Sequence, residues 1–374
     1  MTSLEELSEI SKTIANPAVD KWKAQGKPIV GFFCSYIPEE ILHAAGIFPY
    51  RIKAKGCTNT PAADAFLAPV NCSFVRSCLE LALEGSYGFL DGVVSMNSCE
   101  HIRRLYDIWK RKVKTPYSHF LCVPHKTDEE AVNWYRDELA IFKAGLEKAF
   151  GVSITEESIR NSIAVHNETR DLLRKVYELR QRETPLLTGK EAHEIVVAAM
   201  ATPKEDYNRL LKGLLEEVGK REGISAHGPR LMVMGSVIDD PDYIGIIEDM
   251  GCLVVTDALC FGSRYFWEPV KTNGDLMECL ARSYLKRPVC PRMSEDIGQI
   301  VTYTKEMVEK FNIDGVIMER IRCCDLWGGT TLILQKRLDE RNIPLLVVDR
   351  EYMTSGAGQM STRVGAFLEM IGRG

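Results

Sequence analysis

Short apolar runs alternate with amphipathic segments over the first third of the chain. The apolar runs predict buried strands at residues 28–33, 48–53, 90–96 and 117–123. The segments between them carry apolar residues at helical spacing and predict helices at residues 38–46, 72–84 and 99–113. Alternating strands and helices are typical of a parallel sheet, so residues 1–126 are predicted to form an N-terminal α/β domain.

The pattern becomes purely helical from residue 127 to residue 227. Four amphipathic segments follow one another there, and Ser153 with Glu156 suggests a capping box at the start of the second. Their apolar stripes are typical of ordinary helix cores, and no cluster of candidate ligands lies among them. We therefore expect a helical segment over residues 127–227.

Strand and helix patterns alternate again over residues 228–374. Apolar runs such as RLMVMGSV, CLVVTD, DGVIME and IPLLVVD predict the strands of a C-terminal α/β domain. The predicted fold class is therefore α/β, with two open, mainly parallel α/β units and a helical insert. The segments DGVVSMNSCEHIRR and DGVIMERIRCCD resemble each other and suggest an internal repeat of the two units.

Composition narrows the class of protein. The 374 residues carry a formal net charge of −5, and no basic stripe with interleaved aromatic residues is visible, so a nucleic-acid partner is not expected. No apolar run approaches the ~20 residues that span a bilayer, and the N-terminus lacks a secretory pattern. We expect a cytoplasmic protein without a membrane partner, whose cysteines remain reduced.

Several cysteines follow predicted strands. These are Cys34, Cys99, Cys260 and the vicinal pair Cys323-Cys324. The carboxyl ends of strands in an open α/β sheet face the ligand crevice, so thiols from distant segments are expected to meet there. A single cysteine is more often a small core residue, but this recurrence favours a metal or iron–sulfur site.

Spacing indicates that such a site is assembled from dispersed thiols. The chain has no CxxC motif, which argues against a zinc ribbon or a ferredoxin-type run. Cys72 and Cys78 point to different faces of one predicted helix; we expect Cys72 to face the crevice and Cys78 to lie in the core. Helix N-termini near Cys72 and Cys99 would lower the thiol pKa and favour an anionic cluster.

Nucleotide-binding motifs are absent from the sequence. Neither GxxxxGK[ST] nor GxGxxG after a strand occurs, so another protein should handle any ATP. Candidate acid–base residues lie near the expected crevice, but the sequence does not orient them: His43, His101, Glu39, Glu100 and Asp325.

Longer segments resemble the benzoyl-CoA reductase and 2-hydroxyacyl-CoA dehydratase family. The resemblance covers essentially the whole chain and is carried by GFFCSYIPEEILHAAGIFPYRI, NCSFVRSCLELAL, LDGVVSMNSCEHIRRLYDIWK, DALCFGSRY, DGVIMERIRCCD, IPLLVVDREY and GQMSTRVGAFLEMI. It implies a [4Fe-4S] cluster held by Cys72, Cys99 and Cys324, with the fourth iron position open. It also implies an acyl-CoA substrate, a related second subunit and an ATP-hydrolysing iron–sulfur activator that supplies low-potential electrons.

Two other functions remain open within this resemblance. The surplus thiols Cys34, Cys260, Cys290 and Cys323 suit a homodimeric double-cubane [8Fe-9S] protein that reduces small molecules. In that branch the last ligand aligns better with Cys323 than with Cys324. The third possibility is a non-catalytic, electron-carrying subunit. The sequence does not identify the substrate or decide between one cubane and two.

Overall fold

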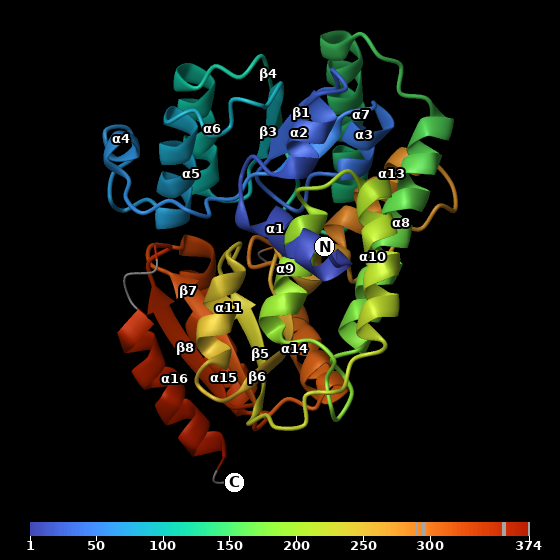
Figure 1. The fold of residues 1–374 in the computed structure, drawn as a ribbon. Helices are drawn as coiled ribbons and strands as arrows, with labels where there is room; N and C mark the ends of the chain where they lie inside the picture. The colour runs from blue at the N-terminus through green and yellow to red at the C-terminus, as the bar shows by residue number, and fades with distance from the viewer. Residues whose placement is uncertain (289, 294–296, 354–356, 373–374) are drawn as a thin grey trace.

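Two four-stranded parallel sheets form the framework of the protein. The structure is a computed structural model that describes residues 1–374 apart from 289, 294–296, 354–356 and 373–374. The strand orders are β2-β1-β3-β4 and β6-β5-β7-β8, and every neighbouring pair is parallel. The predicted pair of α/β units is thereby confirmed (Figure 1).

The elements follow one another in three stretches. The N-terminal stretch holds α1 (Ser3–Lys12), α2 (Pro17–Lys23), β1 (Ile29–Phe32), α3 (Glu39–Ala44), β2 (Phe48–Arg51), α4 (Pro61–Asp64), α5 (Ser73–Leu83), β3 (Gly92–Met96), α6 (Glu100–Lys112) and β4 (Tyr117–Leu121). The helical stretch holds α7 (Glu129–Phe150), α8 (Glu156–Glu178), α9 (Gly189–Ala199) and α10 (Lys204–Val218). The C-terminal stretch holds β5 (Arg230–Gly235), α11 (Pro241–Glu248), β6 (Leu253–Ala258), α12 (Ser263–Phe266), α13 (Leu276–Leu285), α14 (Ile297–Phe311), β7 (Gly315–Ile321), α15 (Asp325–Asp339), β8 (Leu345–Arg350) and α16 (Ala357–Ile371).

The two units are built alike in detail. In the first, the Asp91 carboxylate accepts a hydrogen bond of 2.8 Å from the N–H of Ile29, which starts β1. In the second, the Asp314 carboxylate accepts one of 2.6 Å from the N–H of Arg230, which starts β5. Both aspartates belong to the Asp-Gly pairs that precede β3 and β7, the third strands of the two sheets. This equivalence supports the internal repeat that the sequence suggests.

The helical stretch packs against both units. Helix α7 contacts α13, α8 contacts α3 and α10, and α9 contacts α1 and α11. Figure 1 shows α8 and α10 running along one side of the molecule. The predicted capping box was wrong: α8 begins at Glu156, and the hydroxyl of Thr155 caps it by accepting from the N–H of Ser158 at 3.1 Å. Thr155 directly precedes the first helical residue, where a hydroxyl reaches the free amides of the first turn.

None of the helices in the described part of the chain is both long enough and apolar enough to cross a membrane.

Candidate metal centre

Six cysteines line one cavity between the carboxyl ends of the two sheets. The cavity encloses about 100 Å³, and its wall includes the ends of β1, β3, β5, β6 and β7. The lining thiols are those of Cys34, Cys72, Cys99, Cys260, Cys290 and Cys324, none of which forms a disulfide. The expected meeting of distant cysteines at strand ends is therefore present in the structure.

Three of these cysteines share one local geometry. Cys72, Cys99 and Cys324 are the N-cap residues of α5, α6 and α15. Helix N-termini carry free amide groups and a partial positive charge, which favour an anion at this position. The three sulfur atoms thus lie at the starts of three helices, where a thiolate would face the free amide groups.

Burial and the helix termini act in opposite directions on these thiols. Burial raises the pKa of Cys72 to about 12 and also raises the pKa of Cys99 and Cys324. The amide groups three residues further on, in Val75, Ile102 and Trp327, lower the same pKa values. Without a cation the buried thiols keep their protons, and a bound metal ion would replace those protons.

The remaining three thiols form a second group beside two polar side chains. Cys34, Cys260 and Cys290 line the same cavity; burial raises the pKa of the Cys260 thiol, and the guanidinium groups of Arg51 and Arg264 lower it. The Arg264 guanidinium and the Tyr36 ring belong to the same wall, and both side chains are buried. Cys290 also raises the pKa of Cys324, so the two groups adjoin.

A buried arginine gives the cavity a positive wall. Arg51 is the last residue of β2, is 3% exposed, and has two guanidinium nitrogens without a hydrogen-bond partner among the described residues. Its guanidinium lies over the rings of Phe32 and Phe261 at 5.4 and 4.9 Å. A buried cation with open donors next to uncharged thiols fits an anionic occupant, such as an iron–sulfur cluster bound by thiolates.

The vicinal pair separates in the structure. Cys324 lines the cavity, whereas Cys323 is exposed, is not part of the cavity wall, and has a left-handed backbone with φ of 61°. Cys78 is fully buried in the core, away from the wall. The described residues contain no group of three side chains that converges on a single metal ion. In a cubane each thiolate binds a different iron, so its ligands surround the cluster instead of converging on one point.

Some wall residues were not recognised from the sequence. Arg51 was read as part of a strand, although a charged residue at the end of an apolar run is itself a signal. Arg264 is buried in the wall. His101 also lines the cavity: its Nδ1 accepts a hydrogen bond of 3.2 Å from the N–H of Cys72 and lies 3.7 Å from Asp325.

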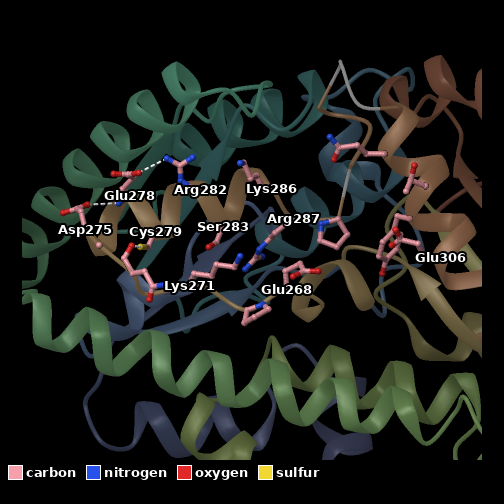
Figure 2. A pocket seen from close by; sticks show the side chains of 17 residues that line it. Glu268, Lys271, Asp275, Glu278, Cys279, Arg282, Ser283, Lys286, Arg287 and Glu306 are labelled. Atoms are coloured by element: carbon pink, nitrogen blue, oxygen red, sulfur yellow. Dashed lines mark hydrogen bonds and ion pairs between the residues drawn. The ribbon is translucent and has the colours of Figure 1, made fainter. Parts of the chain in front are cut away.

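A larger, open pocket is lined in part by Arg287 and Pro288, which precede Cys290 in the chain. It encloses about 580 Å³ between the loop before α13, the helix α13 itself and α14 (Figure 2). Four cations and four carboxylates line it, and Arg282 is paired with Glu278 at 2.7 Å. The cations are Lys271, Arg282, Lys286 and Arg287, and the carboxylates are Glu268, Asp275, Glu278 and Glu306. Arg287 connects this pocket with the cavity, because its guanidinium donates a hydrogen bond of 2.7 Å to the carbonyl of Ser35 in the cavity wall.

Comparison with known proteins gives the family. The family model described as "2-hydroxyglutaryl-CoA dehydratase, D-component" matches residues 34–371, a range that includes all six cavity cysteines. The chain belongs to this family. A subunit of the benzoyl-CoA reductase of Thauera aromatica is 30% identical over 95% of the chain and 94% of that protein. The beta subunit of (R)-2-hydroxyglutaryl-CoA dehydratase of Acidaminococcus fermentans is 25% identical over 98% of both chains.

A third relative of the chain is the putative dehydratase subunit YjiM of Escherichia coli. It is 27% identical over 93% of both chains. The expected resemblance is thereby confirmed, and the chain is a member of a family of acyl-CoA dehydratase and reductase subunits.

Proposed function

We propose that this protein is a low-potential iron–sulfur reductase whose six cavity cysteines hold two cubanes, as in an [8Fe-9S] double-cubane cluster. The observation that carries the proposal is the single cavity lined by six thiols, three of them at helix N-termini. One cubane would use Cys72, Cys99 and Cys324, and the other Cys34, Cys260 and Cys290. Cys323 is left out of this ligand set because it lies outside the wall.

The chain's own residues fit this cofactor chemically. Six thiolates and bound sulfide carry negative charge, which the N-termini of α5, α6 and α15 and the buried Arg51 would stabilise. Apolar side chains such as Phe33, Val75 and Trp327 also line the cavity and restrict water. When bound, the cluster would supply electrons one at a time at low potential.

We also propose the partners that the family resemblance implies. An ATP-hydrolysing iron–sulfur activator would deliver the electrons, since the sequence has no nucleotide-binding motif of its own. A second copy of the chain or a related subunit would complete the assembly. The relatives described as reductase and dehydratase subunits support this part of the proposal.

A second candidate function uses one [4Fe-4S] cluster and an acyl-CoA thioester. The open pocket favours it, because Lys271 and Lys286 could bind the phosphates of coenzyme A close to the Cys290 segment. In this version Cys72, Cys99 and Cys324 would hold the cluster. The other three thiols would line the space for the acyl group.

Iron and acid-labile sulfide in anaerobically purified protein separate the two candidates. Two cubanes predict about eight irons per chain, and one cubane predicts about four. Cys260→Ala should remove roughly half of the iron in the first case and none in the second. Anaerobic protein without iron and sulfide would contradict both candidates.

A further inference from the structure

A cluster of buried charged side chains lies between α3 and α8. Glu40 forms an ion pair of 2.5 Å with Arg170 and accepts a hydrogen bond of 2.6 Å from Tyr284. Glu39 forms an ion pair of 2.7 Å with Lys204. We call this group the buried charge cluster; its members are all less than one-tenth exposed and are Glu39, Glu40, His166, Arg170, Lys204, Tyr265 and Tyr284.

The buried charge cluster is joined to the wall of the thiol cavity. The guanidinium of Arg287 lies 3.6 Å from the centre of the Tyr284 ring and donates to the carbonyl of Ser35, next to Cys34. On the other side, Tyr265 directly follows the wall residue Arg264 and donates a hydrogen bond of 3.2 Å to Glu39. Charges interact strongly across a poorly hydrated interior, so a charge change in the cavity acts on this cluster.

His166 has one ring nitrogen without a partner. Its Nδ1 lies 2.9 Å from the carbonyl oxygen of Ser162, which can only accept, so Nδ1 carries the proton of the neutral ring. Nε2 therefore presents a lone pair. It is buried, has no hydrogen-bond partner among the described residues, and lies 4.0 Å from the carboxylate of Glu39. Nε2 of His166 can therefore take up a proton, and the Glu39 carboxylate lies nearby to accept a hydrogen bond from it.

A path to solvent begins next to His166. The ring of His43 packs edge-on against the His166 ring, with centroids 5.1 Å apart. His43 Nε2 lies 2.9 Å from the carboxylate of Glu205, whose side chain is 60% exposed. His43 Nδ1 lies 2.8 Å from Ser162 Oγ. Glu205 therefore connects His43 with solvent, and Ser162 Oγ lies between His43 Nδ1 and His166 Nδ1, 3.5 Å from the latter. Among the described residues His43 touches His166 through its ring, without a hydrogen bond to Nε2.

We propose that His166 takes up one proton on Nε2 when the iron–sulfur site takes up one electron. The electron comes from an external one-electron donor, and the proton comes from solvent. The new imidazolium N–H is donated toward Glu39, and the summed charge of the cavity and the buried charge cluster stays constant. This inference rests on the proposed function, because it requires a redox centre in the cavity.

The surroundings of His166 give the direction of the coupling. Burial lowers the pKa of His166 well below its usual value, Glu40 raises it, and His43, Lys204 and Arg170 lower it. The ring is therefore neutral before reduction, and a negative charge added to the cavity raises its pKa. The titratable and charged groups facing the ring are Glu39, Glu40 and His43 from α3, Arg170 from α8, Lys204 from α10 and Tyr265 from α12.

The midpoint potential of the cluster, measured against pH, tests this role. His166→Asn keeps an amide N–H for the Ser162 carbonyl but has no nitrogen that takes up a proton. His119→Asn is the matched control, since His119 also has a buried ring nitrogen without a partner among the described residues but lies on β4, outside the cavity wall. If the Asn variant does not fold, His166→Gln provides the same loss of a proton acceptor.

We expect the potential of the wild-type protein and of His119→Asn to fall as pH rises, by up to about 59 mV per unit for one proton per electron. The His166 variants should show a much flatter dependence at equal iron content. If the midpoint potential depends equally on pH in all iron-loaded proteins, the role of His166 is overturned and the proposed function is not. Anaerobic protein without iron would overturn it together with the proposed function.

Discussion

Arg170 and Glu40 form an ion pair of 2.5 Å in which both side chains are buried. Arg170 comes from the helical stretch and Glu40 from the N-terminal unit, directly after the segment that carries Cys34. The pair thus joins α8 to α3 close to the thiol cavity. Burial opposes the ionisation of Glu40, but Arg170 and its neighbours hold the pKa of this carboxyl well below its usual range.

Arg170→Leu should therefore destabilise the protein strongly. It leaves the Glu40 carboxylate buried without its cation, which typically costs about 3–5 kcal/mol. Urea unfolding of metal-free, reduced protein measures the change. Arg160→Leu is the control on the same helix, because its pair with Glu156 is exposed and should contribute less than about 1 kcal/mol. Equal effects of the two substitutions would contradict the account of the buried pair.

Glu319 should make stability depend on pH. Its side chain is fully buried on β7, and burial raises the pKa of Glu319 to about 7, although Arg350 at 3.6 Å and the Tyr243 hydroxyl lower it. Between pH 4.5, the ordinary pKa of the carboxyl in the unfolded chain, and about pH 7, Glu319 is protonated in the folded protein and ionised in the unfolded chain. This difference in protonation adds to the free energy of unfolding at low pH, and the contribution is lost as pH rises through about 7.

Glu319→Gln removes this dependence. The variant should lose the decline of about 2 kcal/mol that the wild-type protein shows between about pH 5 and pH 7. Unfolding free energies across that range measure it. Glu156→Gln, at an exposed position of α8, should keep the wild-type profile. A flat wild-type profile would be incompatible with a raised pKa at Glu319.

Two cysteines of one helix region should differ in their effect on iron. Cys72→Ala removes a thiol of the cavity wall and should abolish or sharply reduce iron at its cubane. Cys78→Ala removes a fully buried core thiol and should cost about 1–2 kcal/mol of stability while iron content stays unchanged. Iron analysis together with thermal unfolding separates the two effects. Iron loss in Cys78→Ala at intact stability would contradict the assignment.

Arg51 should tune the redox centre. Arg51→Met keeps much of the apolar contact with Phe32 and Phe261 but removes the positive charge beside the cavity. The lost attraction, about 1 kcal/mol, should make a one-electron potential roughly 50 mV more negative. Potentiometric titration of both proteins at equal iron content checks this. A midpoint potential equal to the wild-type value would show that the Arg51 charge does not act on the cluster.

The sequence predicted the elements well because their signals are local. Apolar runs and helical spacing identified both sheets, and the strand-end rule anticipated that distant thiols would meet. The resemblance already separated Cys72, Cys99 and Cys324 from the surplus thiols. It could not be predicted that Cys290, and not Cys323, lines the cavity with Cys34 and Cys260, because this depends on how the loops at the two sheets fold. The same applies to the buried ion pairs of Glu39 and Glu40, although Glu39 was a candidate acid–base residue. Their partners Arg170 and Lys204 come from two other helices.

The vicinal pair shows a different limit. The sequence left open whether Cys323 or Cys324 would face the crevice. The left-handed backbone at Cys323 and the helix start after Cys324 decide this in the structure. Both features arise from the junction of β7 with α15, and a sequence pattern does not fix its backbone angles.

Anomalous scattering at the iron edge from anaerobically grown crystals tests the central claim most directly. The account predicts about eight iron positions in the cavity, divided between the Cys72, Cys99 and Cys324 group and the Cys34, Cys260 and Cys290 group. Iron beside the first group alone would contradict the two-cubane site and favour the acyl-CoA candidate. A cavity without iron in anaerobic, iron-replete protein would contradict the account as a whole.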